Sequence, residues 1–347
     1  MSGRFPRDRA MRVVCLKGAF GFENLAFEDR PIPDCGARQV LIRVRAVSLN
    51  ARDLMMAQGT YNPRQKLPLV VCSDAAGDVV ARGTEVVEWR EGDRVCPIFA
   101  GRWQRGALDR AAQRSSLGGP LDGTLSEYFL ADADALVRAP ALLSAEEAAC
   151  LPCAGVTAFR ALLELGQLKA GNSVLCLGTG GVALFGLQIA RAVGARVILT
   201  SRSPEKLARA ETLGADSTID TTQTPEWGDA VRALSDGEGV DQVLEVGGAD
   251  TFAQSLRAVR MGGLVSVIGV LSGARTALDL RPVLMQDVQI QGVFVGSKQT
   301  FLDLIRLVEQ HALRPSIDRV FPVSEARAAF EYAASGRQFG KVVIALD

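Results

Sequence analysis

The sequence has 347 residues, enough for two domains, and 48% of them are hydrophobic, which indicates a protein with a sizeable core. Its 39 Lys and Arg residues balance 39 Asp and Glu residues, so charge gives no indication of binding to nucleic acid or to anionic membranes. The seven cysteines lack C-x-x-C spacing, which favours reduced thiols. The single histidine, His311, excludes most zinc sites and histidine-based triads, and we expect it to be a structural residue at a helix end.

The N-terminal part shows strand and loop signals. Residues 13–16 and 40–49 are apolar or alternating and predict strands, and Asn50 is expected to cap a short helix. Residues 99–130 are rich in glycine and lack periodicity, so they predict a loop. Trp103 in this loop is expected either to line a pocket or to anchor its own loop.

Residues 173–195 carry the clearest motif. An apolar run at 174–177 predicts a buried parallel strand, and the turn GTGGVA at 178–183 leads into a helix that Gly194 ends. In a nucleotide-binding fold, Gly178 permits the tight turn, Gly180 lets a pyrophosphate approach the backbone, and the helix N-terminus binds its charge. The strand–turn–helix context supports this otherwise weak pattern.

The next strand, residues 196–200, indicates which cofactor is bound. NAD sites carry an acidic residue about 20 positions after the first glycine, but this position holds Ser201 followed by Arg202, Ser203 and Lys206. A carboxylate would repel a 2′-phosphate, whereas hydroxyls and cations bind one, so the sequence favours NADPH over NADH. The alternative is a solvated loop with chance cations, which leaves the missing acid unexplained.

Strands and helices then alternate up to a last strand at residues 288–296, which predicts βαβ units, a doubly wound parallel sheet and cofactor binding at the carboxyl ends of its strands. The C-terminal tail predicts helices at 300–311 and 323–332, with Ser324 as a cap, and a closing strand at 339–344. The expected cofactor-binding residues are Thr157, Gly178, Thr179, Gly180, Gly181, Val182, Ser201, Arg202, Ser203, Lys206, Val246, Gly247, Gly269, Val270, Leu271, Phe294, Val295 and Lys341. In this set, Phe294 and Val295 are expected beside the nicotinamide and Lys341 at the pyrophosphate.

Four segments together resemble the medium-chain dehydrogenase/reductase superfamily over nearly the whole chain: AAGDVV at 75–80, GDRV at 92–95, LPCAGVTA at 151–158 and GTGGVA at 178–183. The resemblance implies an α/β protein with a GroES-like β-rich catalytic domain and a Rossmann domain. The GroES-like domain would comprise residues 1–152 and 298–347, and the Rossmann domain residues 153–297. It also implies a homodimer through the last strand of the nucleotide sheet.

The chain departs from the zinc enzymes of this superfamily at their metal ligands. Asn50 stands where those enzymes have a cysteine, residues 72–74 read CSD where they have Gly-His-Glu, and only the third ligand survives, as Cys153. One thiolate cannot hold Zn²⁺, and residues 99–125 lack the cysteines of a structural zinc lobe. The chain therefore resembles the zinc-free, quinone oxidoreductase-like branch, often labelled zinc-binding or NAD(P)-dependent alcohol dehydrogenase.

The predicted activity is zinc-independent, NADPH-dependent transfer of hydride to a quinone or an α,β-unsaturated carbonyl. The candidate catalytic residues are Asn50, Tyr61 and Asp53, although Asn50 also suits a plain helix cap and Asp53 an orienting role. Cys153 is expected to be packed rather than reactive. Two alternatives stay open, an alcohol dehydrogenase or carbonyl reductase and a nucleotide-binding protein with little turnover. The expected partner is a small molecule, with no nucleic acid or membrane, in the cytoplasm.

Overall fold

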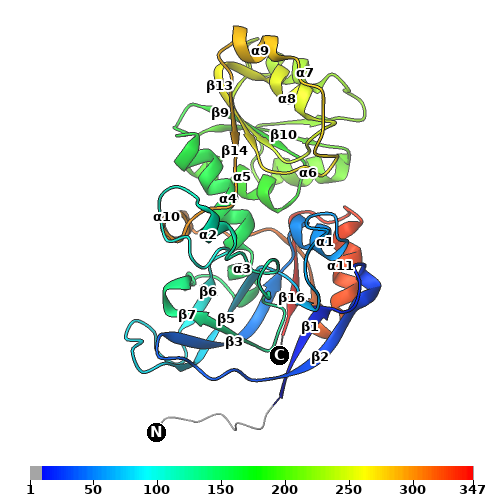
Figure 1. Ribbon diagram of the computed structural model, residues 1–347. Coiled ribbons are helices and arrows are strands. Elements are labelled where there is room, and N and C mark those ends of the chain that lie inside the picture. The colour runs from blue at the N-terminus through cyan, green and yellow to red at the C-terminus, as the bar shows by residue number, and fades with distance from the viewer. Residues whose placement is uncertain (1–9, 347) are drawn as a thin grey trace. The chain divides into compact units, whose positions relative to one another are not determined.

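The computed structural model describes residues 10–346 and divides the chain into two compact units (Figure 1). Unit 1 comprises Met1–Cys153 and Ser297–Asp347, and unit 2 comprises Ala154–Gly296. Both boundaries lie one residue from those expected from the sequence. Each unit has its own sheets and its own hydrophobic core.

Unit 1 is built on a seven-stranded sheet in which the strands follow the order β15-β16-β3-β5-β6-β8 and β7 also pairs with β3. Only β15 and β16 pair in parallel; the other ladders are antiparallel. The bounds are β3 Gln39–Ser48, β5 Asp74–Arg82, β6 Arg94–Pro97, β7 Tyr128–Asp132, β8 Leu136–Arg138, β15 Ile317–Pro322 and β16 Lys341–Ala345. The last strand, β16, thus lies beside β3, so residues near the C-terminus complete a sheet formed mainly by the first third of the chain.

A smaller sheet and several short helices complete unit 1. The small sheet has the order β2-β1-β4, with bounds β1 Ala10–Leu16, β2 Leu25–Pro31 and β4 Leu69–Val70. The helices are η1 Phe22–Asn24, α1 Ala51–Ala57, α2 Arg110–Gln113, η2 Ala133–Ala135, α3 Ala145–Ala148, α10 Lys298–His311, η5 Val323–Glu325 and α11 Ala326–Ala334. Phe330 of α11 packs with Val14, Val44 and Ile344 in one apolar cluster, so the C-terminal helix helps to close the core of this unit.

Unit 2 is a doubly wound domain with a six-stranded, fully parallel sheet. Its strand order, β11-β10-β9-β12-β13-β14, is the order 3-2-1-4-5-6 of a Rossmann fold. The bounds are β9 Ser173–Leu177, β10 Arg196–Ser201, β11 Ser217–Asp220, β12 Val240–Glu245, β13 Val259–Val267 and β14 Gln289–Gly292. The predicted fold class is therefore confirmed.

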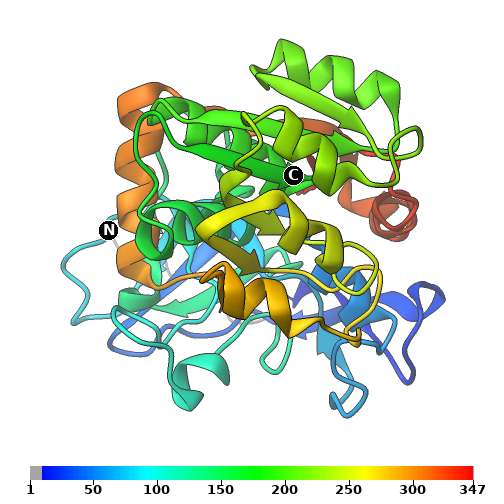
Figure 2. The same cartoon turned by 90° about the horizontal axis from the view of Figure 1, so that it is seen from above.

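The helices of unit 2 connect these strands in the alternation that the sequence predicts. They are α4 Val156–Phe159, α5 Gly181–Ala192, α6 Pro204–Thr212, α7 Trp227–Ala233, α8 Phe252–Ala258 and α9 Leu280–Met285. Pro204 begins α6 and Ser203 caps it, as expected for a helix with proline in its first turn. Figure 2 shows α9 beside α8, and the two helices are in contact.

The boundary between the units falls within one continuous helical stretch, Ala145–Leu165. Two segments in it, η3 Leu151–Gly155 and η4 Arg160–Leu165, are π-helical, a conformation that is rare and frequent at functional sites. By length and composition this stretch could cross a membrane, but 72% of its most apolar window is buried inside the protein. Such burial is typical of a core helix.

Three local expectations differ from the structure. The last strand of the parallel sheet, β14, is four residues long and ends before Val295, which has a positive φ of 39°. Helix α10 begins at Lys298, two residues before the expected start at Thr300, because Ser297 caps it: Ser297 Oγ accepts from Thr300 N, and Thr300 Oγ1 accepts from Ser297 N. Ser324 does not cap a helix, since it lies inside the 3₁₀ turn η5 that precedes α11.

Candidate functional site

The first turn of unit 2 has the geometry of a phosphate cradle. Gly178 has a φ of +74°, which favours glycine, and its N–H lies 3.4 Å from Thr200 Oγ1. A Cβ at Gly178 or Gly180 would meet no heavy atom within 4 Å, so the backbone is open on this side. Helix α5 follows with Gly180 at its N-cap and no side-chain cap, which leaves its first N–H groups for a ligand. These features fit a dinucleotide pyrophosphate.

The end of β10 carries hydroxyls and cations instead of an acid. Ser201 Oγ accepts from Ser203 N at 3.2 Å, and Ser203 Oγ accepts from Lys206 N at 3.4 Å, while Arg202 is exposed. On the neighbouring strand, Asp220 is the register partner of Ser201. Its carboxylate accepts from Thr222 N and Thr222 Oγ1 at 2.9 and 2.7 Å, so it is held in its own turn.

A buried carboxylate, which sequence reasoning missed, shapes the next loop. Glu245 ends β12 and its Oε1 accepts from Gly247 N, Gly248 N and Thr251 Oγ1 at 2.7, 2.9 and 2.7 Å. Its Oε2 accepts from the Ser255 hydroxyl. Glu245 therefore fixes the loop in which Val246 and Gly247 were expected to bind cofactor. In the sequence, an acidic residue at the end of an apolar strand could have indicated such a buried, hydrogen-bonded carboxylate.

The remaining cofactor candidates of unit 2 lie after parallel strands or in a nearby helix. Gly269, Val270 and Leu271 follow β13, and Phe294 and Val295 follow β14. Thr157 is buried inside α4. The structure thus brings most of the predicted cofactor residues to the carboxyl ends of β9, β10, β12 and β13, while their binding role stays a prediction.

A hollow of about 440 Å³ opens at the opposite ends of the same strands. Asn172, Asp241 and Gln289 line it, and each stands at or next to the beginning of a strand. Both carboxylate oxygens of Asp241 already accept hydrogen bonds there, from Asn172, Ser173 and Arg260. Because dinucleotides bind at the carboxyl ends of such strands, this hollow is not the cofactor site.

The candidate catalytic residues of unit 1 meet in a buried polar cluster at the start of α1. Asn50 caps α1, and its backbone N–H donates to Asp53 Oδ2 at 2.9 Å. The Asn50 side chain donates from Nδ2 to Ser73 Oγ at 3.5 Å, and its Oδ1 accepts from Lys341 Nζ at 2.6 Å. Asn50 is therefore a helix cap whose side chain also joins Ser73 and Lys341 in a network, while its catalytic role stays a prediction.

Asp74 is the second carboxylate of this cluster and was missed in the sequence. Its Oδ1 accepts from Ser73 Oγ at 3.1 Å and its Oδ2 from the Cys153 backbone N–H at 3.2 Å. Burial raises the pKa of Asp74 to about 6, against the opposing charge of Lys341 and a hydrogen bond from Asn50. Burial also raises the pKa of Asp53, although the Arg52 charge opposes it.

Lys341 belongs to unit 1, whereas the other cofactor candidates belong to unit 2. It begins β16 in unit 1, is 3% exposed, and its ammonium donates to Leu49 O at 2.7 Å as well as to Asn50 Oδ1. The expected contact with the pyrophosphate stays a prediction, and the two hydrogen bonds make the ammonium part of the Asn50 cluster.

Arg52 connects this cluster to the surrounding loops. Its guanidinium pairs with Asp53 at 3.2 Å and donates to the carbonyls of Leu117, Gly118 and Gly119 at 2.8, 3.4 and 3.0 Å. It also lies 5.0 Å from the Phe99 ring centroid and 5.3 Å from that of Tyr61.

Two aromatic residues expected near the site have different environments. Tyr61 is 44% exposed, so it is not a buried member of the cluster. Trp103 is buried, and its Nε1 donates to Gly106 O at 3.0 Å. Of the two expectations for Trp103, the structure supports the anchor of its own loop.

The residues at the expected metal position do not fit a zinc ion. Asn50 Oδ1 is bound to an ammonium, and Ser73 donates its proton to Asp74. Cys153 is the one residue of a usual zinc-ligand type among the three, and burial together with the Asp74 charge raises the pKa of its thiol. Among residues 10–346, no group of three or more His, Cys, Asp or Glu residues is arranged to hold a metal.

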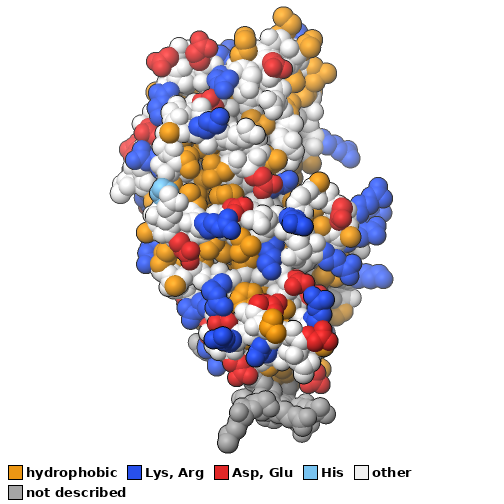
Figure 3. All heavy atoms as spheres, turned by 90° about the vertical axis from the view of Figure 1, so that its left-hand side faces the viewer, with side chains coloured by type: hydrophobic (Ala, Val, Ile, Leu, Met, Phe, Trp, Pro, Cys, Tyr) orange, Lys and Arg blue, Asp and Glu red, His pale blue; other side chains and the backbone are white. Residues whose placement is uncertain are grey.

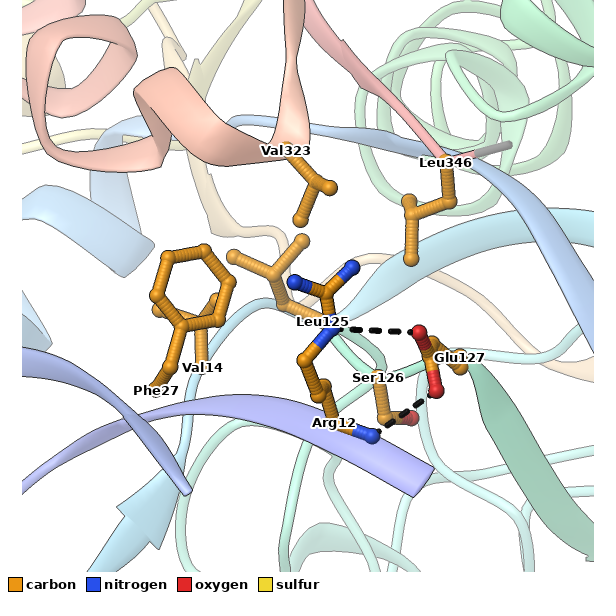
Figure 4. Close-up of a pocket in the computed structure, with 8 residues that line it drawn as sticks. All are labelled: Arg12, Val14, Phe27, Leu125, Ser126, Glu127, Val323 and Leu346. Carbon is orange, nitrogen blue, oxygen red and sulfur yellow. Dashed lines mark hydrogen bonds and ion pairs between the residues drawn. The ribbon is translucent and has the colours of Figure 1, made fainter. Parts of the chain in front are cut away.

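A separate small cavity lies between β1, β2 and the C-terminal elements of unit 1 (Figure 4). Figure 4 shows Arg12 across it, with its backbone N–H and guanidinium bonded to the Glu127 carboxylate at 2.8 and 3.3 Å. Its volume of about 10 Å³ is near the minimum for one water molecule. The cavity is therefore too small for a substrate.

Comparison with known proteins identifies the class. Residues 36–141 match the family "Alcohol dehydrogenase GroES-like domain", and residues 181–310 match the family "Zinc-binding dehydrogenase". The chain therefore belongs to the medium-chain dehydrogenase/reductase superfamily of NAD(P)-dependent oxidoreductases. It is 39% identical over 345 residues to zinc-type alcohol dehydrogenase-like protein C1773.06c of Schizosaccharomyces pombe, covering 97% of this chain and 100% of the relative.

Further relatives carry different activities in their names. Acryloyl-coenzyme A reductase of Metallosphaera sedula is 29% identical, with 96% of this chain and 99% of the relative covered. Among solved structures, an NAD-dependent alcohol dehydrogenase is 32% identical with a TM-score of 0.89, covering 97% and 100% of the two chains. The 2-octenoyl-CoA carboxylase reductase CinF, in complex with NADP and 2-octenoyl-CoA, is 26% identical with a TM-score of 0.85, covering 99% and 88%.

Proposed function

We propose that this oxidoreductase transfers hydride from NADPH, without zinc, to a quinone or to an α,β-unsaturated carbonyl. The observation that carries this proposal is the side-chain set around Asn50, which offers an ammonium and an amide where a zinc enzyme needs three protein ligands. Without a metal, ionising an alcohol is difficult, whereas an electrophilic acceptor needs donors for the oxygen on which charge develops. The reductase names of two relatives agree with this chemistry.

In this proposal each unit has a separate task. The open backbone at Gly178 and Gly180 and the start of α5 bind the pyrophosphate, and Ser201, Arg202 and Lys206 bind the 2′-phosphate. When bound, the nicotinamide supplies a hydride to the electrophilic carbon, is itself oxidised, and leaves an electron pair on the acceptor oxygen. Asn50 donates a hydrogen bond to that oxygen, and a proton from water completes the product.

The first prediction concerns acceptors and metal. We expect the protein to oxidise NADPH with a quinone or an enone and to keep its rate after dialysis against a chelator, because no residue set here requires zinc. The measurement is NADPH absorbance against quinones, enones, aldehydes and alcohols, with metal analysis of the same sample. Loss of activity with the chelator, restored by Zn²⁺, would contradict the zinc-free assignment. Oxidation of alcohols alone would favour an alcohol dehydrogenase, and cofactor binding without any turnover would favour a binding protein.

We also propose that unit 2 pairs with a second copy of the chain. Strand β14 ends the sheet and all four of its residues are exposed, which leaves an unpaired edge. Helix α9, which precedes β14 in the chain, exposes Leu284 and Met285, whose exposed fractions are 80% and 75%. Figure 3 shows hydrophobic side chains near the top of the molecule, at the level where Figure 1 labels α9.

The second prediction follows from this edge. Wild-type protein is expected to sediment at twice the chain mass of 36.9 kDa, and the double variant Leu284→Lys, Met285→Lys at the single mass, because two charges cannot be buried in an apolar interface. Val87→Lys, which changes another exposed apolar residue in unit 1, is the control and should leave the mass unchanged. A monomeric wild type, or a dimer that survives both changes in α9, would contradict the pairing.

A further inference from the structure

Lys341 is a buried cation whose position is fixed by backbone and by one side chain. Gly340, which precedes it, has a φ of +92°, and a Cβ there would clash with Ser316 O. A glycine is therefore required directly before β16, which begins at Lys341. Lys341 Nζ donates to Leu49 O at 2.7 Å and to Asn50 Oδ1 at 2.6 Å. A buried ammonium needs such acceptors, because burying it without them is costly.

The contact with Lys341 decides which way the Asn50 amide faces. An ammonium only donates hydrogen bonds, so the atom of the amide that meets it must be the carbonyl oxygen. The amide nitrogen then faces the other side, where Ser73 Oγ lies at 3.5 Å, at the limit of a hydrogen bond. Because the two ends of an amide have almost the same shape, nothing in the packing alone would select this orientation.

The charges of the cluster balance without a metal ion. Two cations, Arg52 and Lys341, stand against two buried carboxylates, Asp53 and Asp74. The Lys341 charge acts on both carboxylates, since it opposes the effect of burial on the pKa of each. A divalent cation added here would meet an ammonium already bound to Asn50.

We propose that Lys341 is the positioning residue of this site: its ammonium holds Asn50 Oδ1, so that the amide nitrogen is presented as a donor to the reacting oxygen, and it supplies the fixed positive charge that a metal ion supplies in zinc enzymes. The inference rests on the proposed function, since it assumes a substrate oxygen that gains charge. It adds a residue 291 positions from Asn50 in the sequence and gives Lys341 a role other than pyrophosphate binding.

The third prediction separates these two roles. Lys341→Met removes the charge and the donor, and we expect kcat to fall at least about 100-fold, while the dissociation constant of NADPH, measured by fluorescence, stays within about threefold. Lys341→Arg keeps the charge and donors and should recover most of kcat. Lys298→Met is the matched control, because Lys298 Nζ donates to Asp134 O at 2.7 Å outside the cluster. Unchanged kcat in Lys341→Met, or weaker NADPH binding at unchanged kcat, would overturn the proposal.

Two further measurements cover the remaining outcomes. If Lys341→Met does not fold, Asn50→Asp keeps an acceptor for Lys341 but removes the donor, and kcat should fall about as far, on the scale of a lost oxyanion donor; full activity would overturn the proposal. If the wild type reduces no acceptor, the proposed function fails by itself. A neutron crystal structure then tests the positioning directly: we expect both Asn50 Nδ2 protons on the side away from Lys341, and the reverse orientation would refute it.

Discussion

Replacing Arg52 with methionine is expected to lower the free energy of unfolding by about 3–5 kcal/mol, the usual cost of removing one partner of a buried ion pair. The Asp53 carboxylate would stay buried without its cation, and the carbonyls of Leu117, Gly118 and Gly119 would lose their donor. Tyr61 and Phe99 would also lose the guanidinium beside their rings. Urea unfolding followed by fluorescence and circular dichroism measures the change.

The control for this prediction is another arginine–aspartate pair in the same unit. Arg94 pairs with Asp78 at 3.2 Å, but its side chain is 44% exposed, so Arg94→Met should cost less than about 1 kcal/mol. Arg52→Lys keeps the charge but cannot reach three carbonyls with a planar fork, and we expect an intermediate loss. If Arg52→Met and Arg94→Met were equally mild, Arg52 would not be the connection between α1 and the loop at residues 117–119.

The fold was predictable because its signals are local. Gly178 and Gly180 mark the turn before α5 and Gly194 marks its end, and their conformations need only a few neighbouring residues. Strand–helix alternation with parallel strands then restricts the topology to few possibilities. The ends of elements were predicted less well. For example, α10 starts at Lys298 because Ser297 and Thr300 form a reciprocal capping box, which was not recognised in the sequence.

The candidate site was predictable only where a motif marked it. Asn50 and Asp53 lie three residues apart at a helix start, so their contact follows from the local pattern. Lys341 meets Asn50 only because β16 pairs with β3, and no sequence period indicates that pairing. Asp74 and Glu245 lie in apolar stretches, where an acidic residue shows that a partner exists without showing which one.

The largest effect on the choice of cofactor is expected from Arg202→Glu. This change places a carboxylate at the end of β10, where Arg202 is exposed beside Ser201 and Ser203. A carboxylate repels a 2′-phosphate and accepts hydrogen bonds from ribose hydroxyls. Loss of a charged hydrogen bond alone costs about 1.5–3 kcal/mol, which is about a 10- to 150-fold loss of NADPH affinity. NADH affinity should stay the same or increase.

The comparison that decides this assignment is a change of equal charge at the other end of the same strand. Arg196 begins β10 and is exposed, and Arg196→Glu alters the net charge as much as Arg202→Glu does. If the 2′-phosphate is read at residues 201–206, Arg196→Glu leaves the ratio of NADPH to NADH affinity unchanged, because exposed charges beyond about 10 Å are screened at 0.1 M salt. Equal losses of NADPH and NADH affinity in Arg202→Glu, measured by titration of cofactor fluorescence, would instead mean that Arg202 contacts a part common to both cofactors. The assignment of Arg202 to the 2′-phosphate would then be wrong.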